Sequence, residues 1–458
     1  MIHERLGIFN EHYGFTYKRV FVKNQKSCWG SCSANGNLNF NYKLAFLPPH
    51  IAESIAKNGT PAQRELAQMT MLASAAFRGQ RALLTEHPTF ASSATAAAKN
   101  RIVYTAENKS NLPGRQVRTE GSPPTGDPAT DEAYDGAGAT YDLYNDVYGR
   151  NSIDGVGLRI DSTVHYQTNY DNAFWNGQQM VYGDGDGDLF NRFTIAIDVM
   201  GHELTHGVTQ YEASLVYSHQ PGALNESMSD VFGSLVKQRH LGQTAAQADW
   251  LIGAGLLAAG IHGVALRSMK APGTAYDDPL IGKDPQPDHM SHYVNTSSDN
   301  GGVHINSGIP NKAFYLTATA LGGNAWAVAG NIWYRTLLDS RLSSTAQFLD
   351  FANLTADNAN KLYGASVRAA VAQAWHDVGI DVAAILSWQY NKVVNSTFAS
   401  PHSMNAWAYI QDNGWRKVQT LTPDGDSNAF TLLVEAQASN RKVHVYVDGS
   451  LIYQAYSA

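Results

Sequence analysis

The stretch DVMGHELTHGVTQYEASLVYSHQPGALNESMSD, residues 198–230, decides how the whole chain is interpreted. It contains the pattern H-E-x-x-H at residues 202–206, and Glu226 follows twenty residues after His206. Residues four apart lie on one face of an α-helix, so His202 and His206 can bind one metal ion together. Glu203 lies about 100° round the helix from His202, where its carboxylate can hold a water without being a ligand. A hydrolytic zinc site needs three protein ligands and one open position, and two histidines with a distal glutamate supply that set.

Apolar residues flank the motif and predict that its helix is buried in a domain core. They are Ile195, Ile197, Val199, Met200, Leu204 and Val208. Asp230 lies four residues after Glu226, one helical turn on and on the same face. That position suits a carboxylate that orients a zinc-bound histidine. The alternative, a polar helix face without a metal, does not account for this arrangement.

HELTH followed by NESMSD resembles the thermolysin family of zinc metallopeptidases. The similarity spans about residues 104–380 and includes DNAFWNGQQMVYGDGDG at 171–187, LRSM at 266–269 and DNGGVHINSGIPNKAFY at 299–315. It implies an α+β fold with two subdomains: a β-rich half at 103–211 and a helical half at 212–385, with the zinc helix between them. It also implies a zinc endopeptidase with one catalytic Zn²⁺ bound by His202, His206 and Glu226.

The resemblance further implies how the reaction would proceed. Glu203 would accept a proton from the water that attacks the peptide carbonyl. His304 and Tyr217 match the family residues that donate hydrogen bonds to the oxyanion. Asp299 would orient His304. A packing role for His304 alone is the alternative, and its position within DNGGVHINSG argues against it.

Substrate contacts are also implied by the family pattern. Asn172 and Ala173 match positions that bind the substrate backbone, and Arg267 matches the position that contacts a substrate carbonyl. The walls of the pocket after the scissile bond match four apolar residues, namely Phe193, Val199, Ile252 and Leu266. These residues predict cleavage on the amino side of Leu, Phe, Ile or Val.

One departure from the family concerns calcium. The thermolysin type has a double calcium site beside the zinc helix, formed by five acidic residues. The matching positions here are Asp198, Lys237, Asp249, Leu251 and Ala254. A double Ca²⁺ site needs many carboxylate oxygens, and only two acids remain. We therefore expect this site to be absent, with Lys237 paired to Asp198 or Asp249.

The DGDGD run at 184–188 lacks the features of a calcium loop and predicts a tight acidic turn.

Composition limits the compartment and the partners. The 458 residues carry a net charge of −7, which argues against a nucleic-acid partner. The longest apolar run, 251–261, is shorter than the roughly 20 residues that span a bilayer. The N-terminus lacks an ordinary signal peptide, which favours a cytoplasmic protein, whereas the family resemblance favours secretion. We expect a monomer that acts on peptide or protein substrates.

Residues 1–47 differ from the rest of the chain. Six Lys or Arg and two Glu give this segment a charge of +4. Its WGSC stretch resembles the YgjP-like metallopeptidase family, but the zinc motif that follows in that family is missing here. The segment therefore resembles a fragment of a second metallopeptidase. A hairpin is predicted around residues 33–36, and Cys28 and Cys32 are expected to be free thiols rather than metal ligands.

Residues 48–102 are alanine-rich and helical in pattern, chiefly over 62–84 and 92–99. Their Pro-Pro opening resembles the propeptide of the protealysin-like branch of the thermolysin family. Such a propeptide would cover the cleft and be removed by cleavage within Ala96–Thr105, with Arg101 as one candidate point. A permanent helical domain is the alternative.

Residues 396–458 predict a small antiparallel β module. Five strands are expected, at 406–410, 415–421, 429–436, 442–447 and 451–456. The module could bind substrate, a surface or another protein, or only stabilise the chain. The alternative function for the whole chain is a non-proteolytic binding protein that acts through this module.

Overall fold

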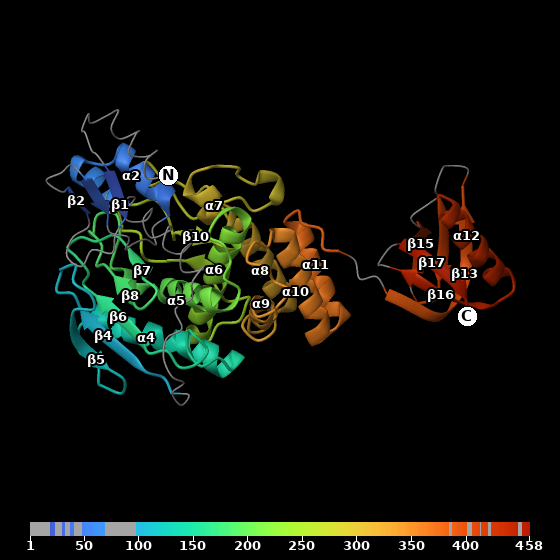
Figure 1. The fold of residues 1–458 in the computed structure, drawn as a ribbon, viewed down its shortest axis with the longest axis horizontal. Helices are drawn as coiled ribbons and strands as arrows, with labels where there is room; N and C mark the ends of the chain where they lie inside the picture. Colours follow the sequence, from blue (N-terminus) through green and yellow to red (C-terminus); the bar gives the residue numbers. More distant parts are fainter. Residues whose placement is uncertain are drawn as a thin grey trace. The chain divides into compact units, whose positions relative to one another are not determined.

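The computed structural model describes residues 19–22, 30–32, 37–40, 48–68, 98–383, 387–400, 405–412, 414–419, 423–447 and 451–458. The chain forms two compact units, Met1–Asp381 and Val382–Ala458, which are described separately (Figure 1). Among the described residues, no helix combines the length and the apolar character needed to cross a membrane.

A five-stranded mixed sheet forms the first half of the peptidase region, with strand order β5-β4-β6-β8-β7. The strands are β4 (Arg101–Thr105), β5 (Arg115–Thr119), β6 (Ile160–Val164), β7 (Ala173–Trp175) and β8 (Met180–Tyr182). This sheet agrees with the β-rich half expected at residues 103–211. Strand β7 pairs antiparallel with β8 and is last in the strand order, so β7 is an edge strand of this sheet.

A helix that the sequence did not predict covers this sheet. Helix α4 (Pro128–Asp142) contacts β4 and β6 and continues as a short π-helix, η1 (Leu143–Val147). The sequence analysis did not predict this helix because it contains glycines, which are unfavourable in helix interiors. Here they permit close packing: a Cβ on Gly136 would lie 2.2 Å from Met200 of α5, and one on Gly138 would lie 2.1 Å from Arg101.

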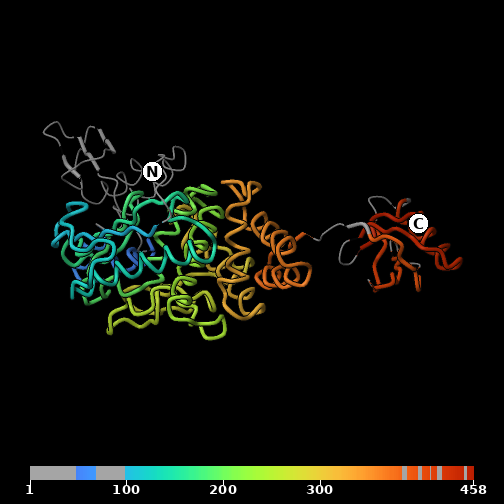
Figure 2. The backbone as a smooth tube through the Cα atoms, turned by 90° about the horizontal axis from the view of Figure 1, so that it is seen from below, coloured from blue at the N-terminus to red at the C-terminus, as the bar shows by residue number. Residues whose placement is uncertain are grey.

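The second half is helical, as predicted, and Figure 2 follows the backbone through it from green to orange. Its helices are α5 (Ile197–Glu212), α6 (His219–Leu241), α7 (Asp299–Asn306), α8 (Gly308–Leu321), α9 (Ala329–Leu337), α10 (Phe348–Tyr363) and α11 (Ala365–Asp377). Short elements connect them: η2 (Phe193–Ile195), η3 (Met290–His292), and the strand pairs β9 (Leu251–Ile252) with β10 (Arg267–Ser268) and β11 (Asp277–Asp278) with β12 (Gly282–Lys283).

Two glycines bring α5 and α6 close together. A Cβ on Gly233 would lie 2.3 Å from the carbonyl oxygen of Asp198, and one on Gly201 would lie 3.0 Å from the Cα of Gly233. Larger side chains at this crossing would force the helices apart. The close crossing lets residues of α6 reach the histidines of α5.

The N-terminal segment contributes a three-stranded sheet and a helix. Strands β1 (Arg19–Val22), β2 (Gly30–Cys32) and β3 (Asn37–Phe40) have the order β1-β3-β2, and β2 pairs antiparallel with β3, which confirms the predicted hairpin pairing. Helix α2 (Pro49–Asn58) follows, and a further helix begins at Pro61 and is described to residue 68. The helical pattern predicted between residues 69 and 97, and Cys28, lie outside the described residues.

The second unit is a closed five-stranded barrel with strand order β13-β14-β15-β17-β16. Its strands are β13 (Ser387–Ala399), β14 (Ala406–Ile410), β15 (Gly414–Val418), β16 (Lys442–Val447) and β17 (Leu451–Ser457). The unit begins at Val382, before the predicted residue 396, because the unpredicted strand β13 belongs to it. The pairing is antiparallel, as expected, except that β15 and β17 are parallel.

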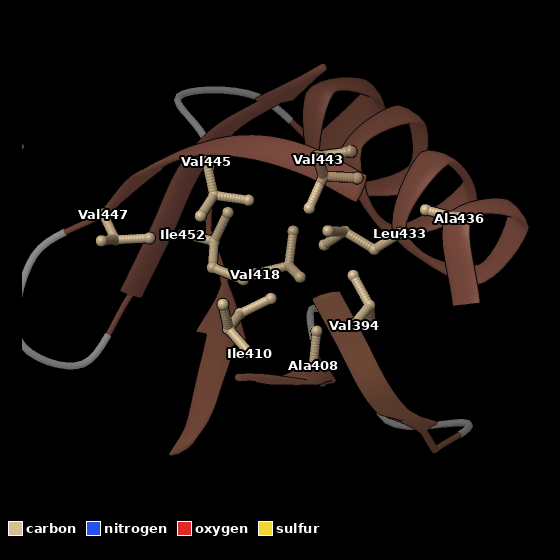
Figure 3. Packing of buried hydrophobic residues seen from close by; sticks show 11 residues of the cluster. Val394, Ala408, Ile410, Val418, Leu433, Ala436, Val443, Val445, Val447 and Ile452 are labelled. Atoms are coloured by element: carbon tan, nitrogen blue, oxygen red, sulfur yellow. The ribbon is translucent and has the colours of Figure 1, made fainter. Parts of the chain in front are cut away.

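The strand predicted at 429–436 was wrong, because this segment lies in helix α12 (Pro423–Ala438). Its aromatic and aliphatic residues suggested a strand. However, the buried residues Ala429, Leu433 and Ala436 are spaced by four and three, which is the helical period. Leu433 points into the barrel core, towards Val394 and Val443 (Figure 3).

Candidate active site

Three side chains from α5 and α6 converge in a buried cluster. The Nε2 atoms of His202 and His206 are 3.0 Å apart. Glu226 places one carboxylate oxygen 3.5 Å from Nε2 of His202 and the other 3.4 Å from Nε2 of His206. All three side chains are buried. The structure thus brings together the two histidines and the distal glutamate that the sequence singled out.

The spacing of these atoms fits a tetrahedral zinc ion. Zinc bonds of about 2.0–2.2 Å at tetrahedral angles place ligand atoms roughly 3.3–3.5 Å apart. The observed separations of 3.0, 3.4 and 3.5 Å are close to those values. A neighbouring carboxylate, Glu203, also lies in the cluster, with an oxygen 3.8 Å from Nε2 of His202. Its other oxygen accepts a hydrogen bond from the backbone N–H of Trp175 at 3.0 Å. Glu226 is therefore the better third ligand.

Each histidine is oriented by a second polar group. Nδ1 of His202 lies 2.7 Å from Asp230, and Nδ1 of His206 lies 2.8 Å from the side-chain oxygen of Asn225. Both contacts use Nδ1, so the Nε2 atom of each histidine faces the Glu226 carboxylate and the other histidine. The sequence identified Asp230 but not Asn225. The position of Asn225 directly before Glu226 was the available signal, but it does not reveal a contact between two helices.

Asp230 is held in turn by a buried network. Arg267, from β10, donates to its carboxylate through Nε at 2.8 Å and Nη2 at 2.7 Å. Asn311 of α8 donates to the same carboxylate at 2.8 Å. Burial opposes ionisation, but the charge of Arg267 and the bond to His202 lower the pKa of Asp230. Burial also opposes protonation of His202, yet its bonds to Asp230 and Glu226 raise its pKa to about 9.

His304 and Tyr217 lie on another side of Glu226. Nε2 of His304 is 3.5 Å from a Glu226 oxygen, and the Tyr217 hydroxyl donates to Glu226 and lies 3.2 Å from Nε2 of His304. Asp299 accepts from the His304 ring at 2.7 Å and from its backbone N–H at 2.8 Å. The positive φ angles of residues 300–302, in the run DNGG, produce the sharp turn that allows both bonds.

The residues expected to contact substrate differ in their hydrogen-bond partners, and those described below are buried. Asn172 is buried and accepts from the backbone N–H of Ala173, which begins edge strand β7. Arg267 is occupied with Asp230, as described above. The four expected pocket residues, Phe193, Val199, Ile252 and Leu266, are all buried. Two of them lie side by side, because the backbone N–H of Leu266 donates to the carbonyl of Ile252 at 3.0 Å.

A cation lies among the positions matched to the calcium site. The Lys237 ammonium is 3.1 Å from Asp198 and 2.8 Å from Asp249, and it donates to the carbonyl of Leu251 at 3.2 Å. Lys237 pairs with both acids, where the sequence led us to expect one or the other.

Helix α2 places an unpredicted histidine near this site. His50 lies 2.6 Å from the Tyr276 hydroxyl and stacks on its ring. Burial lowers the pKa of His50 to about 4, and the charges of Asp299, His304 and Arg267 also act on it. The start of α2 therefore lies within electrostatic reach of Asp299, His304 and Arg267. No motif in the sequence pointed to this contact.

Three family models match the chain. The thermolysin metallopeptidase catalytic domain matches residues 74–210, and the thermolysin metallopeptidase alpha-helical domain matches residues 213–380. A YgjP-like metallopeptidase domain matches residues 1–56. Residues 381–458 lie outside these three matches.

Relatives cover the same region. An extracellular metalloprotease of Pectobacterium carotovorum subsp. carotovorum is 56% identical over 338 residues, which are 73% of this chain and 96% of the relative. Thermolysin of Alicyclobacillus acidocaldarius subsp. acidocaldarius is 43% identical over 293 residues, 61% of this chain and 50% of the relative. The solved precursor of protealysin, a metalloproteinase from Serratia proteamaculans, has 55% identity and a TM-score of 0.67, and the match covers 73% of this chain and 98% of that one.

Proposed function

The chain belongs to the thermolysin family of zinc metallopeptidases, and from this premise we propose that it is an endopeptidase that cleaves on the amino side of hydrophobic residues. The observation that carries the proposal is the triangle formed by the Nε2 atoms of His202 and His206 and the carboxylate of Glu226. Zinc held there would supply Lewis acidity and lower the pKa of water towards 7. The protein groups around it would carry out the proton transfers.

Glu203 is the proposed general base. Its carboxylate lies in the same cluster but outside the ligand triangle, and the Trp175 N–H fixes one of its oxygens at 3.0 Å. We propose that the second oxygen accepts a proton from the attacking water. General bases of this kind contribute about 10²–10⁴ in rate.

Tyr217 and His304 are the proposed donors to the developing oxyanion. Tyr217 lies in the turn before α6 and His304 lies in α7, and the Tyr217 hydroxyl is 3.2 Å from Nε2 of His304. Asp299 accepts from the opposite ring nitrogen, so Nε2 of His304 faces the cluster. Preorganised donors act strongly in a buried site because they need no reorientation during the reaction.

Substrate would bind along edge strand β7. An extended peptide can add to a sheet edge through backbone hydrogen bonds, and Ala173 starts this edge strand. The residue after the scissile bond would then enter the pocket of Phe193, Val199, Ile252 and Leu266. Arg267 is bonded to Asp230, and we propose that its guanidinium also contacts the substrate carbonyl.

Residues 48–102 would act as a removable propeptide. His50 brings the start of α2 to the site, which supports a covering role for this segment. Arg101 is an unsuitable cleavage point, because it lies in paired strand β4 and its side chain binds Glu120 at 2.6 and 2.7 Å. The proposed cut therefore precedes Arg101. We also propose that the protein is secreted, because two relatives are named extracellular metalloproteases.

The test uses peptides that differ only in the residue after the cut. We expect Leu, Phe, Ile and Val to be preferred, activity to disappear after zinc chelation, and added Zn²⁺ to restore it. Glu203→Gln should bind zinc but be inactive. A preference for Lys or Asp would overturn the specificity, and hydrolysis unaffected by chelation would overturn the mechanism.

A further inference from the structure

The order of elements in the second unit identifies its barrel type. The first strand, β13, pairs antiparallel with the second, β14, and with the fourth, β16. The third strand, β15, pairs parallel with the fifth, β17, and helix α12 lies between the third and fourth strands. This closed 1-2-3-5-4 order with an intervening helix is that of the OB-fold, whose second and third strands bind oligonucleotides or oligosaccharides.

Aromatic side chains gather on the outer face of those two strands. Tyr409 of β14 lies opposite Trp415 of β15, and their rings meet edge to face at 5.7 Å. One step along, Trp407 lies opposite Phe398 of β13 on one side and Lys417 on the other. Strand residues two apart share a face, so these five side chains form one surface, here called the aromatic face.

Three of the four aromatic side chains on this face are exposed although they are large and apolar. Phe398 is 51% exposed, Trp415 is 45% exposed and Tyr409 is 37% exposed. The alternate residues Ala408, Ile410 and Val418 fill the barrel core, so the aromatic face does not stabilise the fold through burial (Figure 3). Contiguous exposed aromatics mark binding sites more often than scattered single residues do.

Charge separates the two ligand classes of this fold. Residues 382–458 contain five Lys or Arg and five Asp or Glu, so the unit carries no net charge. Binding of single-stranded nucleic acid needs a positively charged groove that follows the phosphates. The C–H face of a sugar ring, in contrast, packs on the electron-rich face of an aromatic ring and needs no net charge. Polar groups beside the rings add hydrogen bonds: Trp407 donates to the side chain of Asn405 at 2.8 Å.

From these observations we propose that the second unit is an oligosaccharide-binding module and that the aromatic face is its binding surface. It would hold the peptidase on a glycan-bearing surface or glycoprotein, so that substrate lies within reach of the linked active site. The proposal is independent of the peptidase specificity argued above.

The test measures binding of the full chain, with Glu203→Gln to prevent self-digestion, to an array of neutral and sialylated oligosaccharides. We expect at least one glycan class to bind, and Trp415→Ala and Tyr409→Ala each to lower the affinity about tenfold or more. Trp415→Phe, which keeps a ring, should retain most of the binding. The thermal unfolding of each variant is compared with that of the parent.

A matched control lies on the other side of the barrel. Tyr390 of β13 and Tyr456 of β17 flank His444, with ring centroids 5.2 and 5.0 Å apart, and both tyrosines are exposed. Tyr390→Ala and Tyr456→Ala should change glycan affinity less than twofold. The proposal is overturned if no glycan binds, if both faces matter equally, if a 20-nucleotide poly-dT strand binds in place of glycans, or if Trp415→Ala only abolishes self-association.

Discussion

At the scale of single residues, each proposed functional histidine is held by a polar group that H-E-x-x-H does not include. Asp230 holds His202, and Asp299 holds His304. These carboxylates fix ring orientation, and with it the nitrogen that faces the reaction. His206 is held by an amide, Asn225, which orients the ring without adding charge.

The Asn225 contact predicts a selective effect on metal binding. Asn225→Ala removes the acceptor 2.8 Å from Nδ1 of His206 and should weaken zinc affinity about 10–100-fold. Once saturated with zinc, the variant should keep most of its kcat. Competition with a fluorescent chelator measures the affinity, and Asn225→Asp, which preserves an acceptor, is the control. Equal affinity in Asn225→Ala and the parent would refute this role.

His304 should behave in the opposite way. His304→Ala removes a proposed oxyanion donor that is not a zinc ligand, so kcat should fall about 10²–10³-fold while zinc content is unchanged. Peptide hydrolysis and metal analysis of the same sample check both statements. Loss of zinc from this variant would instead assign His304 to the metal site.

The ion pairs of His165 predict a pH effect on the stability of the fold. It bridges Asp184 at 2.8 Å and Asp127 at 3.1 Å, and its bonds to these acids, Asp184 first, outweigh burial and raise its pKa to about 9. A raised folded pKa stabilises fully below the unfolded value of about 6.5, and this stabilisation is lost as pH rises through about 9.

His165→Asn tests this bridge, because asparagine tolerates the positive φ of 52° at this position. Urea unfolding in the Glu203→Gln background should show a loss of about 1 kcal/mol at pH 6, a value reduced for solvent screening. The loss should be smaller at pH 10. An equal loss at both pH values would show that the charge does not contribute.

At the scale of elements, the sequence predicted what local spacing determines and missed what packing determines. The zinc helix followed from the spacing of its histidines and its apolar flanks, and the family resemblance predicted the helical second half. Helix α12 was assigned as a strand because Phe430, Thr431 and Val434 favour strands, whereas its buried residues follow the helical period and pack in the barrel core. Helix α4 was missed because its glycines serve packing against α5 and Arg101, which no local pattern reveals. The contact of His50 with Tyr276 joins residues 226 apart and has no motif.

Lys237 connects three elements, and its contacts predict that the stability of the fold does not depend on calcium. Its ammonium links α6 to Asp198 in the first turn of α5 and to the carbonyl of Leu251 in β9. A calcium-selective chelator should therefore leave Tm almost unchanged. Lys237→Met leaves the buried Asp198 without its counter-charge and should cost about 3 kcal/mol or more. Differential scanning calorimetry measures both effects.

Lys237→Asp is the informative companion variant. It places three acids around the same point, and added Ca²⁺ should then recover part of the lost stability. A large drop in the Tm of the parent chain on chelation would show that calcium binds despite the lysine.

At the scale of the whole molecule, the chain joins a peptidase to segments that the thermolysin models do not match. Residues 1–56 match the YgjP-like model, yet the H-E-x-x-H motif is in the other peptidase region. We therefore assign catalysis to residues 103–385 and covering of the site to α2. This division predicts that removal of the N-terminal segments produces the active form, with the barrel still attached.

Self-cleavage of the purified chain tests that division. The wild-type chain should lose its N-terminal segments with time, and the product should begin before Arg101, because β4 pairs with β6 from Arg101 and with β5 from Ile102. N-terminal sequencing and intact mass locate the cut.

Glu203→Gln should remain whole when incubated alone and should be cut at the same bond when active enzyme is added, because its cleavage site is unaltered. Arg101→Gln should leave the position of the cut unchanged, since this residue stabilises the sheet through Glu120. A product that begins at Ile102, or a Glu203→Gln chain that processes itself, would contradict the assignment.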